Sequence, residues 1–430
     1  MKILLHSHFP AGHAYPMQAV AQALVSRGHD VVWLTSADNE ARVRITGARF
    51  VPTSAIAALD APLALRSATG LLDGDPRVLD GRLLAQVADY RAVLQSFAAD
   101  VLLVDVMPHG ARALYDLAEI PAYATLGVIP MYTSTARAPL AVSGAAPPTS
   151  WLGVLANALR HLFRQWITLP WLVRPVINRQ RSALGLSGLG YGEAAERLTY
   201  SPQLHIQASS PTLEFRLGPK PRQRTAFVGP LVTPTAAASA SRLLPAWWER
   251  VVAHHGPVVG ITQGTLAMDP TCLIIPSVRA LADDPRNLLV VVSPHAAEIE
   301  SQVGASDNVL FAEWLPYHVL LPQLRLLVTN GGYGSITQAL SHGVPLLCAG
   351  QSEDKKDTAA RVSWSGAGID LKTDTPSVDE VRNAARQILE DDSYAEDAAR
   401  LGDELNALGG AHRAVDLLEE LVESSASTAK

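Results

Sequence analysis

Short apolar runs alternate with longer amphipathic stretches along most of the chain. In the first half, the apolar runs lie at residues 3–5, 31–35, 101–105 and 121–125, and helix-like stretches lie at 17–27, 83–97 and 110–118. Runs of this length that are apolar throughout are typical of parallel strands covered on both faces by helices. The pattern therefore predicts a doubly wound α/β sheet in the first half.

The second half repeats this pattern. Its apolar runs lie at residues 257–262, 287–292, 308–311, 326–330 and 345–349, and helix-like stretches separate them. A chain of 430 residues is also too long for one ordinary core. We therefore expect two Rossmann-like domains that face a central cleft at the carboxyl ends of their strands, where open parallel sheets bind ligands.

The domain boundary is expected in a stretch of small residues. Residues 229–241, GPLVTPTAAASAS, contain prolines and show no periodicity, which is typical of a linker. The expected N-terminal domain is 1–228, and the expected C-terminal domain is 242–409. Residues 410–430 have an amphipathic pattern and are expected to form a helix that packs back towards the N-terminal domain.

Residues 126–200 break the alternation with apolar bulk, including Trp151, Trp166 and Trp171. A covered pocket for an apolar acceptor is the favoured interpretation of this segment. Plain core packing and a helix on a membrane surface would also use such residues.

Composition narrows the class of protein. The chain is 48% hydrophobic and 18% charged, with a net charge of −6, which argues against nucleic acid as a partner. Cys272 and Cys348 are the two cysteines, too few for a disulfide framework, so a cytoplasmic location is expected. No run suggests a signal peptide or a transmembrane segment.

The stretch 328–345, VTNGGYGSITQALSHGVP, places glycines between a strand and a helix. Helix N-termini attract phosphate because their N–H groups are unpaired and the helix dipole is positive there. Gly332 and Gly334 would let the backbone approach a phosphate, and Ser335 would add a hydroxyl. A tight turn without a ligand would look similar, but a second such turn at 261–267, ITQGTLA, offers Thr265 opposite and favours a diphosphate.

His13 and Asp105 are the candidate catalytic pair. His13 is expected in a loop after the first strand, and Asp105 ends a strand of the same sheet. An aspartate bonded to one imidazole nitrogen leaves the other free to take a proton from an alcohol. A loop histidine can also be merely structural.

Several stretches of the sequence resemble a known enzyme family. Residues 314–362 look like the donor-binding signature of the nucleotide-sugar-dependent glycosyltransferases of the GT-B fold, in the branch of natural-product and macrolide enzymes. The segments PAGHAYPM (10–17), RGHDVVWLT (27–35) and FVGPL (227–231) also fit. The resemblance implies a nucleotide sugar as co-substrate and no further cofactor.

The resemblance also implies roles for single residues. The aromatic ring of Trp314 would stack on the uracil or thymine base, and His13 would be the base with Asp105 orienting it. Gly332, Gly334 and Ser335 would bind the diphosphate, with Thr265 opposite. Asp354 would hydrogen-bond sugar hydroxyls.

Four positions depart from the family pattern. Asn330 stands where the family has the diphosphate histidine, and Gln338 where it has the ribose-binding glutamate. Lys355 replaces the glutamine of the Asp-Gln pair, and Tyr317 replaces the glutamine after Trp-x-Pro.

The expected function is that of an inverting, metal-independent glycosyltransferase that moves glucose from a UDP-sugar to a hydroxyl of an apolar small molecule. A dTDP-deoxysugar-dependent antibiotic glycosyltransferase and a non-catalytic auxiliary homologue remain alternatives. A nucleotide-sugar epimerase shares the two-domain fold but would usually lack the apolar segment at 126–200.

Overall fold

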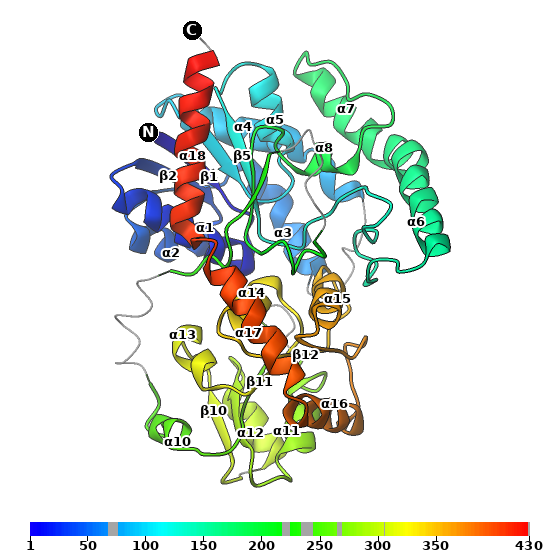
Figure 1. The fold of residues 1–430 in the computed structure, drawn as a ribbon. Coiled ribbons are helices and arrows are strands. Elements are labelled where there is room, and N and C mark those ends of the chain that lie inside the picture. The colour runs from blue at the N-terminus through cyan, green and yellow to red at the C-terminus, as the bar shows by residue number, and fades with distance from the viewer. Residues whose placement is uncertain (68–75, 217–223, 234–243, 265–268, 305, 429–430) are drawn as a thin grey trace.

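Two α/β domains stand one above the other in the computed structural model, which describes residues 1–67, 76–216, 224–233, 244–264, 269–304 and 306–428 (Figure 1). The N-terminal domain contains a parallel sheet of order β3-β2-β1-β4-β5-β6-β7. Its strands are β1 Lys2–His6, β2 Asp30–Thr35, β3 Arg49–Pro52, β4 Val101–Val104, β5 Tyr123–Gly127, β6 His205–Gln207 and β7 Thr225–Phe227.

The C-terminal domain contains a second parallel sheet, of order β10-β9-β8-β11-β12-β13. Its strands are β8 Val258–Thr262, β9 Leu288–Val292, β10 Val309–Ala312, β11 Leu326–Thr329, β12 Leu346–Cys348 and β13 Gly368–Asp370. In both sheets the strand order reverses beside the first strand of the domain. The expected fold of two doubly wound domains is confirmed.

Helices cover both faces of each sheet. In the N-terminal domain they are α1 Ala11–Ser26, η1 Ala37–Asn39, α2 Glu40–Thr46, α3 Ala55–Ser67, η2 Pro76–Leu79, α4 Arg82–Leu94, α5 His109–Asp116, α6 Trp151–Phe163, the π-helical η3 Arg164–Val173, α7 Arg174–Ala183 and α8 Ala195–Thr199. In the C-terminal domain they are α10 Trp248–Val252, α11 Ile274–Leu281, α12 Ala296–Val303, α13 Tyr317–Leu320, η4 Leu321–Gln323, α14 Tyr333–Ser341, α15 Lys355–Ser365, α16 Val378–Glu390 and α17 Ser393–Asn406, followed by α18 Gly410–Thr428.

The continuous apolar strands explain this layering. Successive side chains of a strand point to opposite faces, so a strand that is apolar throughout feeds two cores. Ile3 and Leu5 of β1 pack in the core that includes α1 and α18, whereas Leu4 packs in the core that includes α4 and α5. The strand β8 divides in the same way, with Val258 in one core and Val259 in the other.

The chain returns to the N-terminal domain between its last two helices. α17 packs on α14 of the C-terminal domain, and α18 then packs on α1 of the N-terminal domain. The inner face of α18 belongs to the core of the N-terminal sheet, and Arg27 and His29 bind Asp416 and Glu419 of α18 at 2.6 and 2.7 Å. Residues 234–241, most of the expected linker, lie outside the described residues.

Helix α1 begins earlier than the pattern indicates. The pattern predicts a helix over 17–27, but α1 begins at Ala11 and includes Pro16, although a proline inside a helix removes one backbone donor. His13 therefore lies in the first turn of a helix and not in a loop, and its backbone N–H bonds to the carbonyl of Pro10 at 3.0 Å. The helix backbone thus fixes the direction of the His13 side chain.

The pattern also misses short strands. β3, β6, β7 and β13 read RFVP, HIQ, TAF and GID, so each contains a polar or charged residue and none is a continuous apolar run. Residues 126–200 do interrupt the alternation, because most of that segment is α6, η3, α7 and α8 with no strand after Gly127.

Candidate active site

His13 and Asp105 form a hydrogen-bonded pair. β4 ends at Val104, so Asp105 stands at the carboxyl edge of the N-terminal sheet, beside the first turn of α1. Nδ1 of His13 lies 2.9 Å from Oδ2 of Asp105, and the His13 side chain keeps 19% of its surface exposed. The carboxylate is held from two further directions, by the backbone N–H groups of His8 at 2.9 Å and Val106 at 2.6 Å.

His13 and Asp105 shift each other's pKa values. Burial by itself would lower the pKa of His13, but the hydrogen bond and charge of Asp105, with the charges of Asp354 and Glu353, raise the pKa above its ordinary value. Burial by itself would raise the pKa of Asp105, but the hydrogen bond and charge of His13 lower it. Asp105 therefore stays ionised and holds Nδ1 as its donor, so that Nε2 is the nitrogen that can take a proton.

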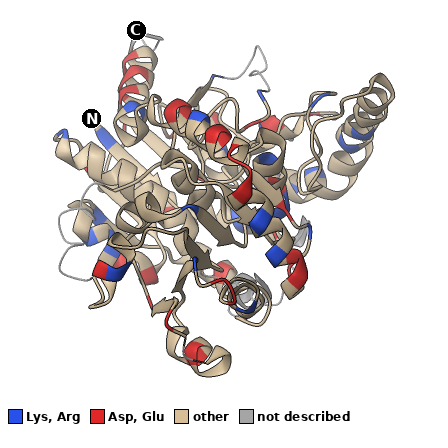
Figure 2. Cartoon of the chain, turned by 60° about the horizontal axis from the view of Figure 1, so that its bottom comes forward, with Lys and Arg blue, Asp and Glu red and all other residues tan. Residues whose placement is uncertain are grey.

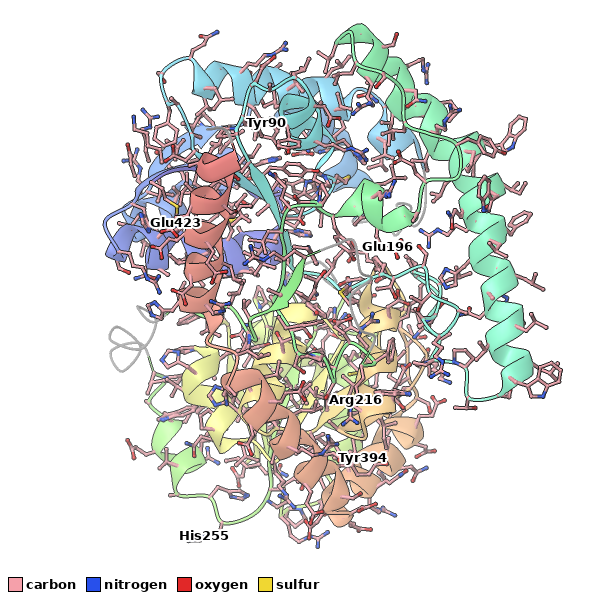
Figure 3. The ribbon with its side chains drawn as sticks, turned by 45° about the horizontal axis from the view of Figure 1, so that its top comes forward. Tyr90, Glu196, Arg216, His255, Tyr394 and Glu423 are labelled. Atoms are coloured by element: carbon pink, nitrogen blue, oxygen red, sulfur yellow. The ribbon has the colours of Figure 1, made fainter. Side chains whose placement is uncertain are left out.

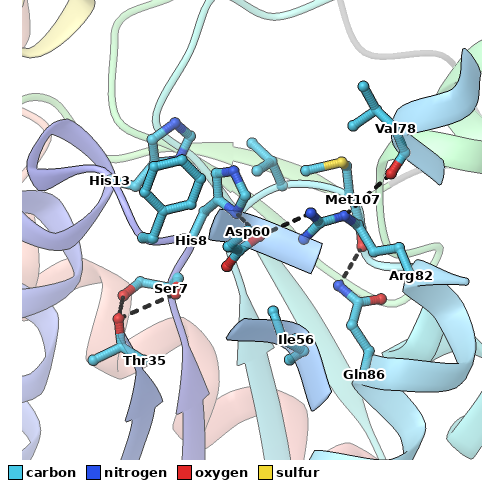
Figure 4. Close-up of polar contacts among 12 residues, drawn as sticks. Ser7, His8, His13, Thr35, Ile56, Asp60, Val78, Arg82, Gln86 and Met107 are labelled. Carbon is cyan, nitrogen blue, oxygen red and sulfur yellow. Dashed lines mark hydrogen bonds and ion pairs between the residues drawn. The ribbon is translucent and has the colours of Figure 1, made fainter. Parts of the chain in front are cut away.

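A second buried pair stands beside the first. Arg82 donates to Asp60 at 2.8 Å, and Nδ1 of His8 lies 4.0 Å from the same Asp60 oxygen. The His8 ring lies 5.5 Å from the His13 ring (Figure 4). Burial, with the charge of His13, lowers the pKa of His8 well below its ordinary value, so His8 is neutral beside the catalytic candidate.

The glycine-rich turn opens helix α14 at the carboxyl edge of the C-terminal sheet. Gly332 is the residue before the first turn of α14, and the space around Gly334 is open, since a Cβ added there would meet nothing within 4 Å. Gly331 has φ +89°, which explains the glycine at that position. The turn therefore leaves room for a ligand beside the unpaired N–H groups of the helix.

Asn330 and Gln338 flank this turn. A Cβ added at Gly264, after β8, would lie 3.2 Å from the side-chain amide of Asn330, so the two glycine-bearing turns are adjacent. The Gln338 amide nitrogen donates back to the carbonyl of Gly334 at 3.0 Å. Thr265, expected opposite the diphosphate, lies outside the described residues.

The remaining donor candidates lie around the same edge. Trp314 follows β10 and is 55% exposed, so its indole is open to a ligand. Asp354 directly precedes α15, and burial raises its pKa despite the neighbouring Lys355. Lys355 is buried, and its Nζ donates to Glu353 at 2.6 Å. The charge of the lysine is therefore paired with a carboxylate two residues away. Glu353 has φ +54°, a rare conformation for a side-chain-bearing residue.

The catalytic pair and the donor side influence each other's pKa values. Asp354 acts on the pKa of His13, and His13 acts on that of Asp354, across the domain boundary. Among the described residues, no group of three or more His, Cys, Asp or Glu side chains is placed to hold a metal ion. None of the described helices is both long and apolar enough to cross a membrane.

A buried cluster that the sequence pattern did not indicate joins the domains. Glu214 accepts from Arg361 at 2.8 Å and from the hydroxyl of Tyr333 at 2.5 Å, and Gln207 donates to that hydroxyl at 2.7 Å. Arg361 also donates to the carbonyl of Met131 at 2.8 Å. Tyr333 is the first residue of α14, so the glycine-rich turn is tied directly to the N-terminal domain. Isolated polar residues far apart in the sequence give no signal of such a cluster.

Three comparisons place this arrangement among known proteins. Residues 287–421 match the family model described as "Erythromycin biosynthesis protein CIII-like, C-terminal domain". The chain is 36% identical to 4'-demethylrebeccamycin synthase of Lentzea aerocolonigenes over 96% of this chain and 97% of that protein. It is 27% identical to UDP-glucosyltransferase B1 of Starmerella bombicola over 97% of this chain and 96% of that protein.

Solved structures agree in fold. The spinosyn rhamnosyltransferase SpnG complexed with thymidine diphosphate superposes with a TM-score of 0.68 and 22% identity, covering 97% of this chain and 100% of that one. The two stacked parallel sheets, the glycine-rich turn and the near-complete match to these relatives lead to one conclusion. The chain belongs to the natural-product glycosyltransferases of the GT-B fold and is a nucleotide-sugar-dependent glycosyltransferase.

Proposed function

We propose that the chain transfers glucose from UDP-glucose to a hydroxyl of an apolar small molecule, with inversion at the anomeric carbon. The observation that carries the proposal is the His13–Asp105 pair, with Nδ1 and Oδ2 2.9 Å apart at the edge of the N-terminal sheet. A relative that matches nearly the whole chain is named a UDP-glucosyltransferase, which supports this donor.

In the proposed reaction, Nε2 of His13 takes the proton of the acceptor hydroxyl. The acceptor oxygen then forms a bond to the anomeric carbon as the bond to the diphosphate oxygen breaks. Asp105 stabilises the imidazolium that forms, because it is ionised and bonded to Nδ1. The negative charge that develops on the leaving diphosphate is stabilised by the N–H groups at the start of α14.

The donor roles of the C-terminal domain are part of the proposal. Trp314 stacks on the nucleobase, Gly332, Gly334 and Ser335 hold the diphosphate with Asn330 beside them, and Asp354 and Lys355 stand at the sugar end. The exposed indole of Trp314 and the open space at Gly334 support these assignments. Residues 1–228 would bind the acceptor, and residues 242–409 the donor.

A dTDP-deoxysugar is the second candidate donor, and Gln338 is the observation that favours it. The neutral Gln338 stands where the family has the ribose-binding carboxylate, and its amide nitrogen already donates to Gly334. Thymidine carries no 2'-hydroxyl, so it needs such a carboxylate less than uridine does. The structurally similar rhamnosyltransferase was solved with thymidine diphosphate.

A mass-spectrometric screen of UDP- and dTDP-sugars against aromatic and macrocyclic alcohols tests the proposal. A product with the mass of acceptor plus hexose, formed from UDP-glucose, is the expected result. Product formation from dTDP-deoxysugars alone would establish the second candidate. If UDP or dTDP binds but no sugar is transferred to any acceptor, the chain is an auxiliary homologue and the catalytic proposal is wrong.

One variant separates the two donors. Gln338→Glu restores the carboxylate, so it should strengthen UDP binding relative to dTDP binding, as measured by calorimetry. An unchanged ratio of the two affinities would show that Gln338 does not read the ribose.

A further inference from the structure

Helix α6 and the following η3 turn polar side chains inwards. The amide nitrogen of Asn157 donates to the carbonyls of Ala136 at 3.0 Å and Ala138 at 2.5 Å, and the ring of His161 bonds to Ala138 at 2.9 Å. Both side chains are buried. The polar side of α6 thus faces the protein, the reverse of an ordinary surface helix.

The outer face of the same segment is apolar. Leu155, Leu159 and Phe163 are 52%, 59% and 61% exposed, and they recur at the spacing of one helix face. The exposed apolar side chains of the segment are Trp151, Leu152, Leu155, Leu159, Leu162, Phe163, Trp166, Ile167, Trp171 and Leu172. Side chains of α6 stand out from the edge of the molecule, away from the sheets (Figure 3). A contiguous exposed patch of this kind marks an interaction surface.

The segment that carries this face has basic residues and no acidic ones. Residues 120–192 contain no aspartate or glutamate, although the whole chain has a net charge of −6. The basic residues of that segment, apart from histidine, are Arg137, Arg160, Arg164, Arg174, Arg179 and Arg181, of which Arg179 and Arg181 form ion pairs with Asp80 and Asp116 from outside the segment. Helices α6 and α7 accordingly show blue and no red (Figure 2). Arg137 and Arg160 are exposed, and Arg160 belongs to α6 itself.

We propose that α6 and η3 bind the surface of an anionic lipid membrane, with the apolar face inserted among the acyl chains and the arginines at the head groups. Tryptophan, phenylalanine and leucine on one face with arginine at its borders is the pattern of an interfacial helix. Arginines attract anionic lipid, so the charge of the segment is complementary to such a surface. A second copy of the chain would bring the same positive segment against itself, which disfavours self-association. The helix lies on the membrane and does not cross it, in agreement with its length and hydropathy.

Vesicle flotation tests the proposal without any substrate. The protein is mixed with vesicles of phosphatidylcholine alone or of phosphatidylcholine and phosphatidylglycerol in equal amounts, and it should float with the second kind only. Leu155→Ser/Leu159→Ser should lower the affinity for these vesicles by at least about tenfold, because two inserted leucines are lost. Circular dichroism of the variant should show an unchanged helix content.

The matched control is Ile45→Ser/Val252→Ser, which replaces two side chains of similar exposure, 63% and 54%, outside the segment. This control should float as the unmodified protein does. Arg137→Gln/Arg160→Gln should weaken binding and reduce its dependence on salt.

Three results would overturn the proposal. The first is failure of the unmodified protein to float with anionic vesicles, and the second is flotation of the leucine variant to the same extent as the unmodified protein. The third is that the unmodified protein sediments as a dimer and the leucine variant as a monomer. The last would show that a second copy covers the face.

Discussion

The two halves of the candidate site are built in different ways. On the N-terminal side, the chemistry stands in side chains that are already bonded to each other, since Asp105 is held by His13 and by two backbone N–H groups. On the C-terminal side, the site is open space beside a helix start, where a Cβ at Gly334 would meet nothing within 4 Å. One half is assembled before any ligand arrives, whereas the other is shaped to receive one.

This difference follows from the two tasks. A general base works only when its tautomer and direction are fixed, so it needs partners within the protein. A diphosphate brings its own acceptor atoms and needs only N–H groups and room for the backbone to approach. Damage to the first half should therefore reduce turnover and spare nucleotide binding, whereas damage to the second half should weaken nucleotide binding itself.

His13→Ala should produce the largest effect on turnover. Removing a general base typically costs about 10²–10⁴-fold in rate. UDP affinity should stay nearly unchanged, because the base belongs to the other domain. Steady-state rates on an ordinary alcohol, with calorimetry for UDP, provide the measurement.

Two controls distinguish a missing base from a damaged fold. A thiophenol or nitrophenol acceptor needs little help in losing its proton, so it should recover much of the lost rate in His13→Ala. Asp105→Asn combined with His13→Ala should add little to the single loss, because the two residues act as a unit. Near-normal turnover of His13→Ala on an alcohol would place the base elsewhere.

Arg361→Met should destabilise the protein at the buried cluster that joins the two domains. The substitution leaves the buried Glu214 without its cation, with only the Tyr333 hydroxyl and the N–H of Met131 as partners. Removing one partner of a buried ion pair costs about 3–5 kcal/mol in the free energy of unfolding. Urea denaturation measures this loss.

The control for that variant is Arg44→Met, whose ion pair with Glu40 on α2 is exposed. Exposed pairs contribute about 0–1 kcal/mol, so this variant should unfold almost as the unmodified protein does. Glu214→Leu combined with Arg361→Met should regain part of the stability, because no buried charge is then left alone. Equal stability of both arginine variants would mean that the cluster does not hold the domains together.

Gly334→Val should weaken UDP binding at least about tenfold, because loss of even one charge-assisted hydrogen bond costs about 1.5–3 kcal/mol. The branched side chain would occupy the open space that the phosphate needs. Since nothing surrounds that position, thermal stability without UDP should hardly change. Ser335→Ala should weaken binding less, because it removes one hydroxyl. Full UDP affinity in Gly334→Val would show that the diphosphate binds elsewhere.

The sequence predicts the two halves unequally well. The strands of both sheets that are apolar throughout were recognisable, because a strand buried on both faces has no polar position. The glycine-rich turn before α14 was also recognisable, because its residues are contiguous. The first turn of α1 was not recognised, since the predicted helix began at Met17 whereas the observed one begins at Ala11 and includes Pro16, a residue that is uncommon inside helices.

Contacts between distant residues could not be predicted. Asp60 and Arg82, or Glu214 and Arg361, become neighbours only through the packing of whole elements. The polar inner face of α6 gave no signal either, because an amphipathic pattern does not say which face is turned to the protein. Asn157 and His161 are inside because carbonyls of residues 136 and 138 meet them there.

The smallest expected effect is a shift of the pH–rate profile. This shift compares the influence of each domain on the pKa of His13. A general base acts when it is neutral, so turnover should fall as the pH drops through the pKa of His13. Asp105 raises this pKa, so the acidic limb should lie at higher pH than for an unperturbed histidine, and Asp105→Asn should move it to lower pH.

The free energy of unfolding should depend on pH in the opposite direction, with more stability at low pH. The protonated His13 is the form that Asp105 stabilises, so its contribution to folding is present below the ordinary histidine pKa and is lost as the pH rises through the raised pKa.

Asp354 contributes to the raised pKa of His13 from the other domain, so Asp354→Asn should also move the acidic limb of the pH–rate profile to lower pH, by less than Asp105→Asn does. Initial rates at saturating donor, measured across pH for the three proteins, check this order. An unmoved limb in Asp354→Asn would mean that the two halves do not interact electrostatically.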